Sequence, residues 1–320
     1  MKYVFVLLFA LVLMGCTNNI QYDWSDHEKK DLLFVSHLKE PLLSVIDPEM
    51  AEIVEVFELP FTASDMVYIE KKNVIVLSSQ QETDLYTLDL ESGGLSSAVE
   101  VGEGVASLLY DEREEMIYAA HSHKDRVSQV SIDPFEKVAQ ADTDDHPLSM
   151  DVDSNQNHLY VANVYGNTIQ VLHTDGLEVI DTLKVIDRPN GVLLVEDGLL
   201  VGGHGPFGDL NRDTYYRTFE GEDVLLETGL MPIDIIRGGE RGYVISHGSH
   251  EVTAVDLSSM EVVDQVEVPH NPYYGIMSPS ELIVSSLDGD AVTFIDPRDL
   301  TIKTKITVQA GPHAMVYVRH

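Results

Sequence analysis

The sequence predicts an all-β fold, a seven-bladed β-propeller of four-stranded antiparallel blades. Three observations carry this prediction. Short apolar strands recur roughly every 40 residues, which is typical of a repeat architecture. The two ends of the chain supply complementary parts of that repeat. No long window shows helical periodicity, and Ser, Asp and Gly turns are too frequent for a parallel α/β fold.

Each repeat contains a second strand in which apolar residues end in a small polar residue or a histidine. Seven segments fit this pattern: 33–37, 74–78, 117–121, 159–163, 200–204, 243–247 and 283–286. Third strands often end in an Asp turn, as at Ile132-Asp133-Pro134, where the carboxylate bonds local amides and Pro fixes φ. Four short strands per repeat are typical of propeller blades.

The ends of the chain predict how the ring closes. The first repeat begins directly at a second strand, 32–36, whereas the chain finishes with a first strand, 314–318. We expect these two segments to share blade one, so that the C-terminal strand joins the N-terminal blade and leaves no open sheet edge. The propeller domain is therefore predicted over 31–320.

The first sixteen residues predict a signal peptide. Lys2 is followed by an unbroken apolar run, 3–13, which is too short to span a bilayer as a helix. The ending Leu13-Met14-Gly15-Cys16 resembles the bacterial lipobox, which implies cleavage before Cys16 and diacylation of its sulfur. The alternative is a plain signal peptide with a chance cysteine.

Two acyl chains on Cys16 would make a stable membrane anchor. We therefore expect the membrane as a partner and an extracytoplasmic, lipid-anchored location at the cell membrane. Residues 17–30 are polar and turn-rich, and they are predicted to form a tether between lipid and domain.

Composition and missing motifs argue against several kinds of site and partner. Cys16 is the only cysteine, so neither a disulfide framework nor a thiolate metal cluster is expected. A formal net charge of −34 argues against nucleic-acid partners, whose phosphates need basic surfaces. The sequence contains no Gly-x-Ser-x-Gly elbow, no phosphate-binding glycine loop and no His-Glu-x-x-His, so common hydrolase and nucleotide-dependent chemistries have no support.

Three segments resemble a known repeat family. The stretches 158–163 (HLYVAN), 166–169 (GNTI) and 311–314 (GPHA) are similar to the Tyr-Val-Thr-Asn (YVTN) repeats of surface β-propellers. The resemblance covers roughly 31–320 and implies the propeller fold. It implies little about function, because similar propellers occur in surface-layer proteins, secreted proteins and metalloenzymes.

Histidines gather on one predicted face of the ring. Connections from second to third strands, and from one blade to the next, lie on the same face, and nine of the 13 histidines fall there. Four of them predict a transition-metal site at the channel mouth: His37, His247, His270 and His313. Asp65, Asp145 and Asp234 could accept hydrogen bonds from ligating rings. The alternative is that these histidines cap strand ends and pack across the channel.

The same face carries a candidate binding surface. Its predicted members are His121, His146, His204, Arg212, Tyr273 and Tyr274. Arg212 lies in an insertion of blade five, 204–216, and could receive a carboxylate. The insertion is either a binding loop or merely tolerated. Its stretch 209–213 resembles a calcium loop but lacks the glycine and the bidentate glutamate of one.

Two functional hypotheses follow. The first is a non-enzymatic binding or scaffold module that holds a protein or glycan at the cell envelope. The second is a metal-dependent lyase, lactonase or redox enzyme built on the four channel-mouth histidines. Missing catalytic motifs favour the first, and convergence of three imidazoles on one point would favour the second.

Overall fold

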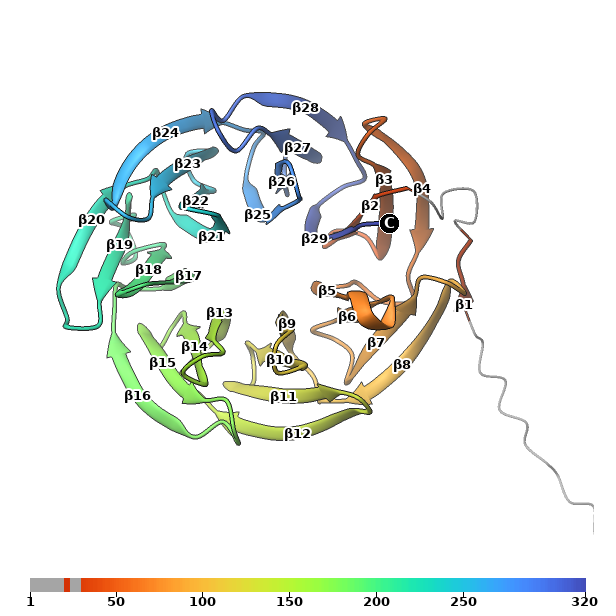
Figure 1. The fold of residues 1–320 in the computed structure, drawn as a ribbon, viewed down its shortest axis with the longest axis horizontal. Helices are drawn as coiled ribbons and strands as arrows, with labels where there is room; N and C mark the ends of the chain where they lie inside the picture. The colour runs from red at the N-terminus through yellow and green to blue at the C-terminus, as the bar shows by residue number, and fades with distance from the viewer. Residues whose placement is uncertain (1–19, 24–29) are drawn as a thin grey trace, which may run out of the picture.

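The computed structural model describes residues 20–23 and 30–320, which form seven sheets around a central channel (Figure 1). Each sheet is one blade, and its strands are arranged in order from the channel to the rim. The described part contains one short 3-10 helix, Glu70–Lys72, and holds no helix long and apolar enough to cross a membrane. The prediction of a seven-bladed, all-β propeller is confirmed. The predicted signal peptide 1–16, with Cys16, lies outside the described residues.

Blades two to seven each use four consecutive strands, antiparallel throughout. Blade two contains β5 (Asp65–Ile69), β6 (Val74–Ser78), β7 (Asp84–Asp89) and β8 (Gly94–Glu100), and blade three contains β9 (Val105–Asp111), β10 (Met116–His121), β11 (Arg126–Ile132) and β12 (Phe135–Asp142). Blade four contains β13 (Pro147–Asp153), β14 (His158–Asn163), β15 (Thr168–His173) and β16 (Val179–Lys184), and blade five contains β17 (Pro189–Val195), β18 (Gly198–Gly203), β19 (Asp213–Thr218) and β20 (Asp223–Glu227). Blade six contains β21 (Pro232–Gly238), β22 (Arg241–Ser246), β23 (Glu251–Asp256) and β24 (Glu261–Glu267), and blade seven contains β25 (Pro272–Met277), β26 (Leu282–Ser286), β27 (Ala291–Ile295) and β28 (Ile302–Thr307).

Blade one closes the ring. It contains β29 (Pro312–Val318), β2 (Leu32–His37), β3 (Leu42–Asp47) and β4 (Glu52–Glu58), in that order from channel to rim. The C-terminal strand pairs antiparallel with β2, and Leu32 lies opposite Val318. Closure by the C-terminal strand is therefore confirmed.

Neighbouring blades are held together by apolar layers between them. Side chains alternate between the two faces of a strand, so each middle strand contributes to two layers. Between blades seven and one, Met315 packs in one cluster with Leu33, Val35, Ile283 and Phe294, all of them buried. Every blade is therefore stabilised by contacts with both of its neighbours.

Buried carboxylates add a polar link between blades two and three, four and five, and six and seven. They belong to Asp65, Asp151 and Asp234, and the Oδ1 atom of each accepts the backbone amide of the following residue. Each Oδ2 accepts an amide from the innermost strand of the following blade: Asp65 from Leu108 (2.7 Å), Asp151 from Leu194 (2.6 Å) and Asp234 from Gly275 (3.0 Å). These bonds satisfy the buried carboxylates and set the register of adjacent blades.

The segment expected as a tether is partly docked on the propeller. The short strand β1 (Ile20–Gln21) pairs with the rim strand β8 and makes the sheet of blade two five-stranded. Tyr22, the next residue, is buried. Residues 20–23 of the predicted tether 17–30 therefore belong to the folded unit.

We predict that deletion of residues 312–320, which removes β29, abolishes cooperative unfolding. The strand buries Ala314, Met315, Val316 and Val318. Losing three large apolar side chains at about 1.5–3 kcal/mol each, together with strand pairing, removes a large share of the 5–15 kcal/mol typical of a domain. Circular dichroism during heating measures this.

The matched control removes only Arg319 and His320, which follow β29. Their loss leaves the paired strand intact and should change the melting midpoint little. A sharp melt near the wild-type temperature in the longer deletion would show that blade one does not depend on β29.

Candidate functional site

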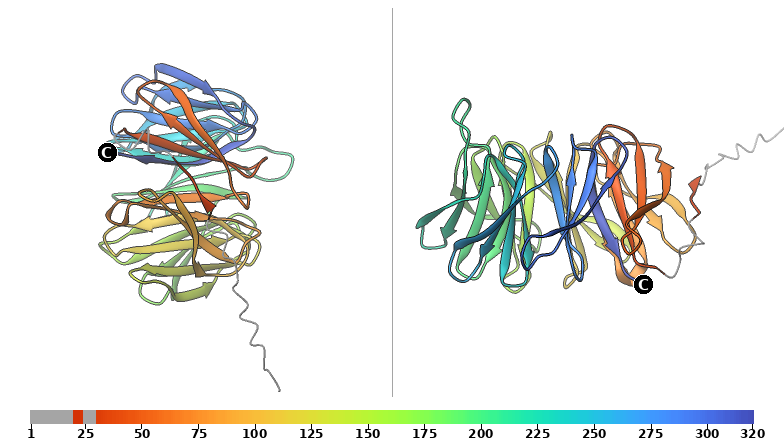
Figure 2. Two further views of the ribbon diagram at one scale, coloured as in Figure 1. Left: turned by 90° about the vertical axis from the view of Figure 1, so that its right-hand side faces the viewer. Right: turned by 90° about the horizontal axis from the view of Figure 1, so that it is seen from above.

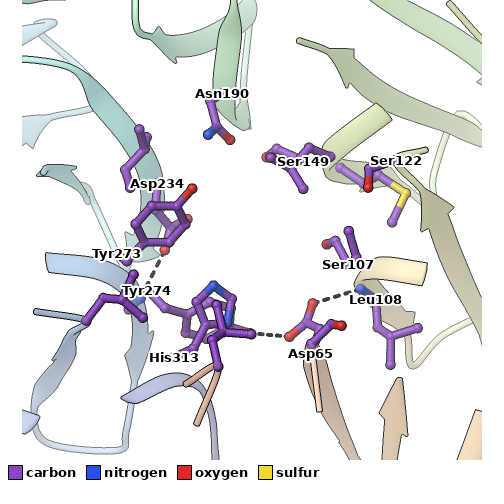
Figure 3. Close-up of a pocket in the computed structure, with 18 of the residues that line it drawn as sticks. Asp65, Ser107, Leu108, Ser122, Ser149, Asn190, Asp234, Tyr273, Tyr274 and His313 are labelled. Atoms are coloured by element: carbon purple, nitrogen blue, oxygen red, sulfur yellow. Dashed lines mark hydrogen bonds between the residues drawn. The ribbon is translucent and has the colours of Figure 1, made fainter. Parts of the chain in front are cut away.

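The channel contains a cavity of about 580 Å³ lined mainly by the innermost strands (Figure 3). Five of these strands begin with Pro, which fixes φ and needs no ladder partner at a strand start. The residue after each of these prolines lines the cavity: Leu148, Asn190, Ile233, Tyr273 and His313. One sequence position per blade thus supplies much of the wall.

A carboxylate and a tyrosine meet across the closing blade. Tyr274 of blade seven donates its hydroxyl to Asp65 Oδ1 of blade two at 3.1 Å, and both line the cavity (Figure 3). Burial, and then the nearby carboxylate of Asp65, holds the pKa of the Tyr274 hydroxyl well above its usual value. Tyr274 therefore stays a hydrogen-bond donor at every physiological pH.

The two cavity carboxyls are less acidic than ordinary aspartates. Burial raises the pKa of Asp65 to about 6, although hydrogen bonds from the Leu108 amide and others oppose the shift. Burial also raises the pKa of Asp234 to about 7, and the charge of Asp65 adds a little. Near neutral pH the cavity thus carries about one to two negative charges at these positions.

Rings from blades five, six, seven and one form a chain of contacts, and three of its members line the cavity: Tyr273, Tyr274 and His313. Centroid distances are 5.1 Å for His204–His247, 5.8 Å for His247–Tyr273, 5.4 Å for Tyr273–His313 and 5.5 Å for Tyr274–His313. Burial lowers the pKa of His204 and His313 to about 4 and also lowers that of His247. These imidazoles are neutral at pH 7 and offer uncharged donors and acceptors.

Two predicted site histidines are buried and form hydrogen bonds within their own blades. His37 Nε2 lies 2.8 Å from Ser44 Oγ, and His121 Nε2 lies 2.9 Å from Ser128 Oγ. Both rings are fully buried, and each joins the end of a second strand to the third strand seven residues later. His37 is therefore not a channel-mouth ligand, and His121 is not part of an accessible binding face.

The four histidines predicted as metal ligands lie in separate surroundings. His270 is exposed beside His250, with ring centroids 4.2 Å apart, and its Nδ1 is 3.9 Å from Asp288 Oδ2. Only His247 and His313 belong to the chain of ring contacts, and each packs against Tyr273. Across residues 20–23 and 30–320, no three His, Cys, Asp or Glu side chains are placed to hold one metal ion. The geometry does not assemble the predicted four-imidazole site, because the rings have different partners: His37 bonds Ser44, His247 bonds Asn271, and His270 lies exposed beside His250.

The acceptors proposed for the metal site serve elsewhere. Asp65 and Asp234 bond backbone amides of neighbouring blades and face the cavity. Asp145 is exposed, and its carbonyl oxygen accepts the amides of Tyr165 and Gly166.

Other predicted binding-face residues do reach the mouth. His146 lines the cavity, and its ring lies 5.2 Å from that of His123 and 4.8 Å from that of Tyr165. Tyr273 and Tyr274 also line it. Asn190, Ser107 and Ser149 were missed, although the Pro that precedes Asn190 is the sequence signal that marks its position.

The blade-five loop lies apart from the cavity wall. Residues 204–212 connect β18 and β19, whereas 213–216 of the predicted insertion belong to β19. The loop projects from one face of the ring (Figure 2, right-hand view). Arg212 is exposed on it, and Phe207 has 86% of its surface exposed with the Arg188 guanidinium 4.2 Å from its ring centroid.

Comparisons with known proteins identify the fold alone. No model of a known protein family matches the chain, and no curated protein matches its sequence. A protein of unknown function from Desulfotomaculum acetoxidans is similar in structure, with a TM-score of 0.74, 10% identity, and coverage of 91% of this chain and 99% of that one. Kuenenia stuttgartiensis hydrazine synthase gives a TM-score of 0.69 at 12% identity, covering 87% and 93%. Apo AztD from Citrobacter koseri gives 0.58 at 11%, covering 91% and 98%. At such low identity a shared architecture does not imply a shared site or function.

We predict that acid destabilises the protein between pH 6.5 and about 4. Burial lowers the pKa of four histidines to about 4: His37, His121, His204 and His313. The unfolded chain therefore binds more protons in this window, and the free energy of unfolding falls as pH falls. The raised pKa values of Asp65, Asp151 and Asp234 act oppositely, but they offset only part of the effect of the four histidines, to which His146 and His247 add because burial also lowers their pKa.

Denaturant unfolding at pH 7, 6, 5 and 4.5 measures the effect, and we expect a net loss on the order of a few kcal/mol. The variant His121→Gln removes one titrating ring and should flatten the pH dependence. An unfolding free energy that stays constant or rises toward pH 4.5 would contradict the predicted proton uptake.

Proposed function

We propose that the protein is a lipid-anchored, extracytoplasmic binding propeller of the cell envelope that holds a glycan in its central cavity. One observation carries the proposal: a cavity of about 580 Å³ whose wall combines a tyrosine ring with uncharged amide, hydroxyl and imidazole groups. This volume lies within the roughly 300–1,000 Å³ of small-ligand sites.

The wall suits a neutral polyhydroxylated ligand. Sugars present hydroxyls that both donate and accept hydrogen bonds, together with apolar C–H faces that pack on aromatic rings. Tyr273 supplies such a ring, Asn190 supplies an amide, and Ser149 supplies a hydroxyl (Figure 3). Asp65 and Asp234 also line the cavity and add carboxyl groups to its polar wall. The imidazoles add no positive charge, and the one cation of the lining, Arg237, donates to the Leu194 carbonyl, so the two carboxyls make the cavity a poor site for an anion.

Placement at the envelope has separate support. The lipobox-like ending at Cys16 favours export and anchoring, and the net charge of −34 favours a hydrated surface outside the cell. The resemblance to YVTN repeats also favours a surface propeller. The metal-dependent alternative lacks support, because no three ligands converge among the described residues.

A protein partner is the second candidate, and the blade-five loop favours it. Phe207 is the most exposed of the large apolar side chains described, at 86%. An exposed aromatic at the tip of a projecting loop is a common anchor in protein interfaces.

We predict that Tyr273→Ala and Asn190→Ala each weaken glycan binding about tenfold, because each removes a contact of about 1–2 kcal/mol. A glycan array probed with the mature protein identifies the ligand, and calorimetry with that ligand measures affinity. The matched control is Phe219→Ala, which removes a half-exposed ring from a turn that does not line the cavity.

Phe207→Ala separates the two candidates. Envelope pull-downs that lose a protein with Phe207→Ala, but not with Tyr273→Ala, would replace the glycan proposal with the protein one. An array without a cavity-dependent ligand would count against the glycan as well.

We predict that Cys16→Ser releases the protein from membranes. Without the sulfur no acyl chain can be attached, and the two buried chains supply the membrane affinity. Fractionation of cells followed by mass measurement of the N-terminal peptide checks this. Equal membrane association of wild type and variant, or an unacylated Cys16, would remove the anchor from the proposal.

A further inference from the structure

The N-terminal strand is attached to the rim by several bonds. Ile20 pairs with Leu95 and Gln21 with Gly94, while the side-chain amide of Gln21 donates to the Ser92 carbonyl at 2.8 Å. Ile20 also packs on the apolar cluster shared by blades one and two. β1 therefore extends the sheet edge of blade two.

Tyr22 spans the joint between blades one and two. Its amide donates to the Gly93 carbonyl of blade two at 2.8 Å, and its hydroxyl donates to the Glu58 carbonyl of blade one at 2.9 Å. Its ring lies 4.9 Å from that of Phe57, and only 8% of the residue is exposed. A side chain this well enclosed is part of the folded unit.

Gly93 is required for this attachment. A Cβ placed there would lie 1.8 Å from the Tyr22 carbonyl oxygen, and the residue has φ +71°. Both the close approach and the left-handed backbone demand glycine. Gly176 has a similar φ of +83°, but a Cβ placed there would meet nothing within 4 Å. An alanine at position 176 would therefore strain the backbone alone, whereas an alanine at position 93 would also displace β1.

The attachment shortens the reach of an anchor at Cys16. Three residues lie between Cys16 and Ile20, so the four Cα-to-Cα steps from one to the other span at most about 14 Å. Without docking, the sixteen residues from Cys16 to Leu32 could extend to about 55 Å and would permit any orientation. β1 lies on the outer rim, part-way along the height of the ring (Figure 2, right-hand view).

A docked β1 restricts which surface can meet the bilayer. A seven-residue strand spans about 23 Å, so laying a channel mouth flat on the lipid would need the short linker almost fully stretched. The rim beside β1, built from β4 and β8, is nearer to the anchor than any other part of the ring. Strand β20 lies across the ring from it (Figure 1).

We propose that β1 holds the propeller edge-on at the membrane, with the β4–β8 rim facing phospholipid headgroups and both channel mouths open to the sides. The inference rests on the proposed acylation of Cys16. It assigns to residues 20–22 the role of orienting the cavity so that a ligand parallel to the membrane can enter it.

The test uses the full mature lipoprotein in phosphatidylcholine vesicles that carry headgroup nitroxide quenchers. Fluorophores are attached to Ser96→Cys on β8 and, separately, to Leu225→Cys on β20, both exposed positions. The acylated Cys16 has no free thiol, so each label is unique. We expect several-fold stronger quenching at position 96 than at 225.

Release of β1 should remove this difference. Gly93→Ala and, independently, Tyr22→Ala are expected to make quenching at the two positions similar, whereas Gly176→Ala should preserve the difference. Tyr22→Ala leaves the turn of blade two unchanged, so it decides the result if Gly93→Ala does not fold.

Equal quenching at the two positions in the acylated parent, or an unchanged difference in both release variants, would overturn the orientation while leaving the anchor intact. A mass spectrum without acyl chains on Cys16 would overturn the anchor and the orientation together. The glycan measurements on the cavity depend on neither outcome.

Discussion

Ring closure by β29 against β2 is the constraint on which the rest of the structure depends. A sheet edge exposes unpaired amides and carbonyls, and a propeller is stable only when its first and last blades pack on each other. Here one blade is built from both chain ends, so the apolar layers between blades one and seven form only after the whole chain is in place. The cavity exists because closure brings seven innermost strands around one axis.

Closure also explains the chemistry of the cavity wall. Strands from different blades place between one and five residues each around the axis, and burial removes the carboxyls of Asp65 and Asp234 from water. Asp65 and Asp234 offset the cost of this desolvation by accepting amides from the next blade, and Asp151 makes the same bond outside the cavity lining. The hydroxyl of Tyr274 bonds Asp65 across blade one. Groups that hold the ring together thereby also make its interior polar.

The histidines show how one residue type at one repeat position acquires different roles. His37 and His121 are buried, and each forms a hydrogen bond with the serine seven residues later. The third strands of blades five and six present no such serine to His204 and His247, whose rings instead lie against each other and, for His247, against Tyr273. The position of a histidine at the end of a second strand therefore predicts where it lies in the blade. Whether its ring is buried or contacts other rings depends on the residue that the third strand places opposite it.

The sequence by itself determined the number of blades, the four-stranded repeat, the second strands and the closing strand, because alternation of apolar residues and Asp turns are local properties that repeat along the chain. It also singled out Tyr273, Tyr274, His146 and His313 as candidate site residues, and the structure places all four in the cavity lining. Only the tertiary structure decided that Asn190, Ser107 and Ser149 share one cavity, that His270 lies apart from His313, and that residues 20–23 dock on blade two. The physical reason is that these outcomes depend on distances between residues far apart in the chain, and ring orientation is set by hydrogen bonds that no local pattern encodes.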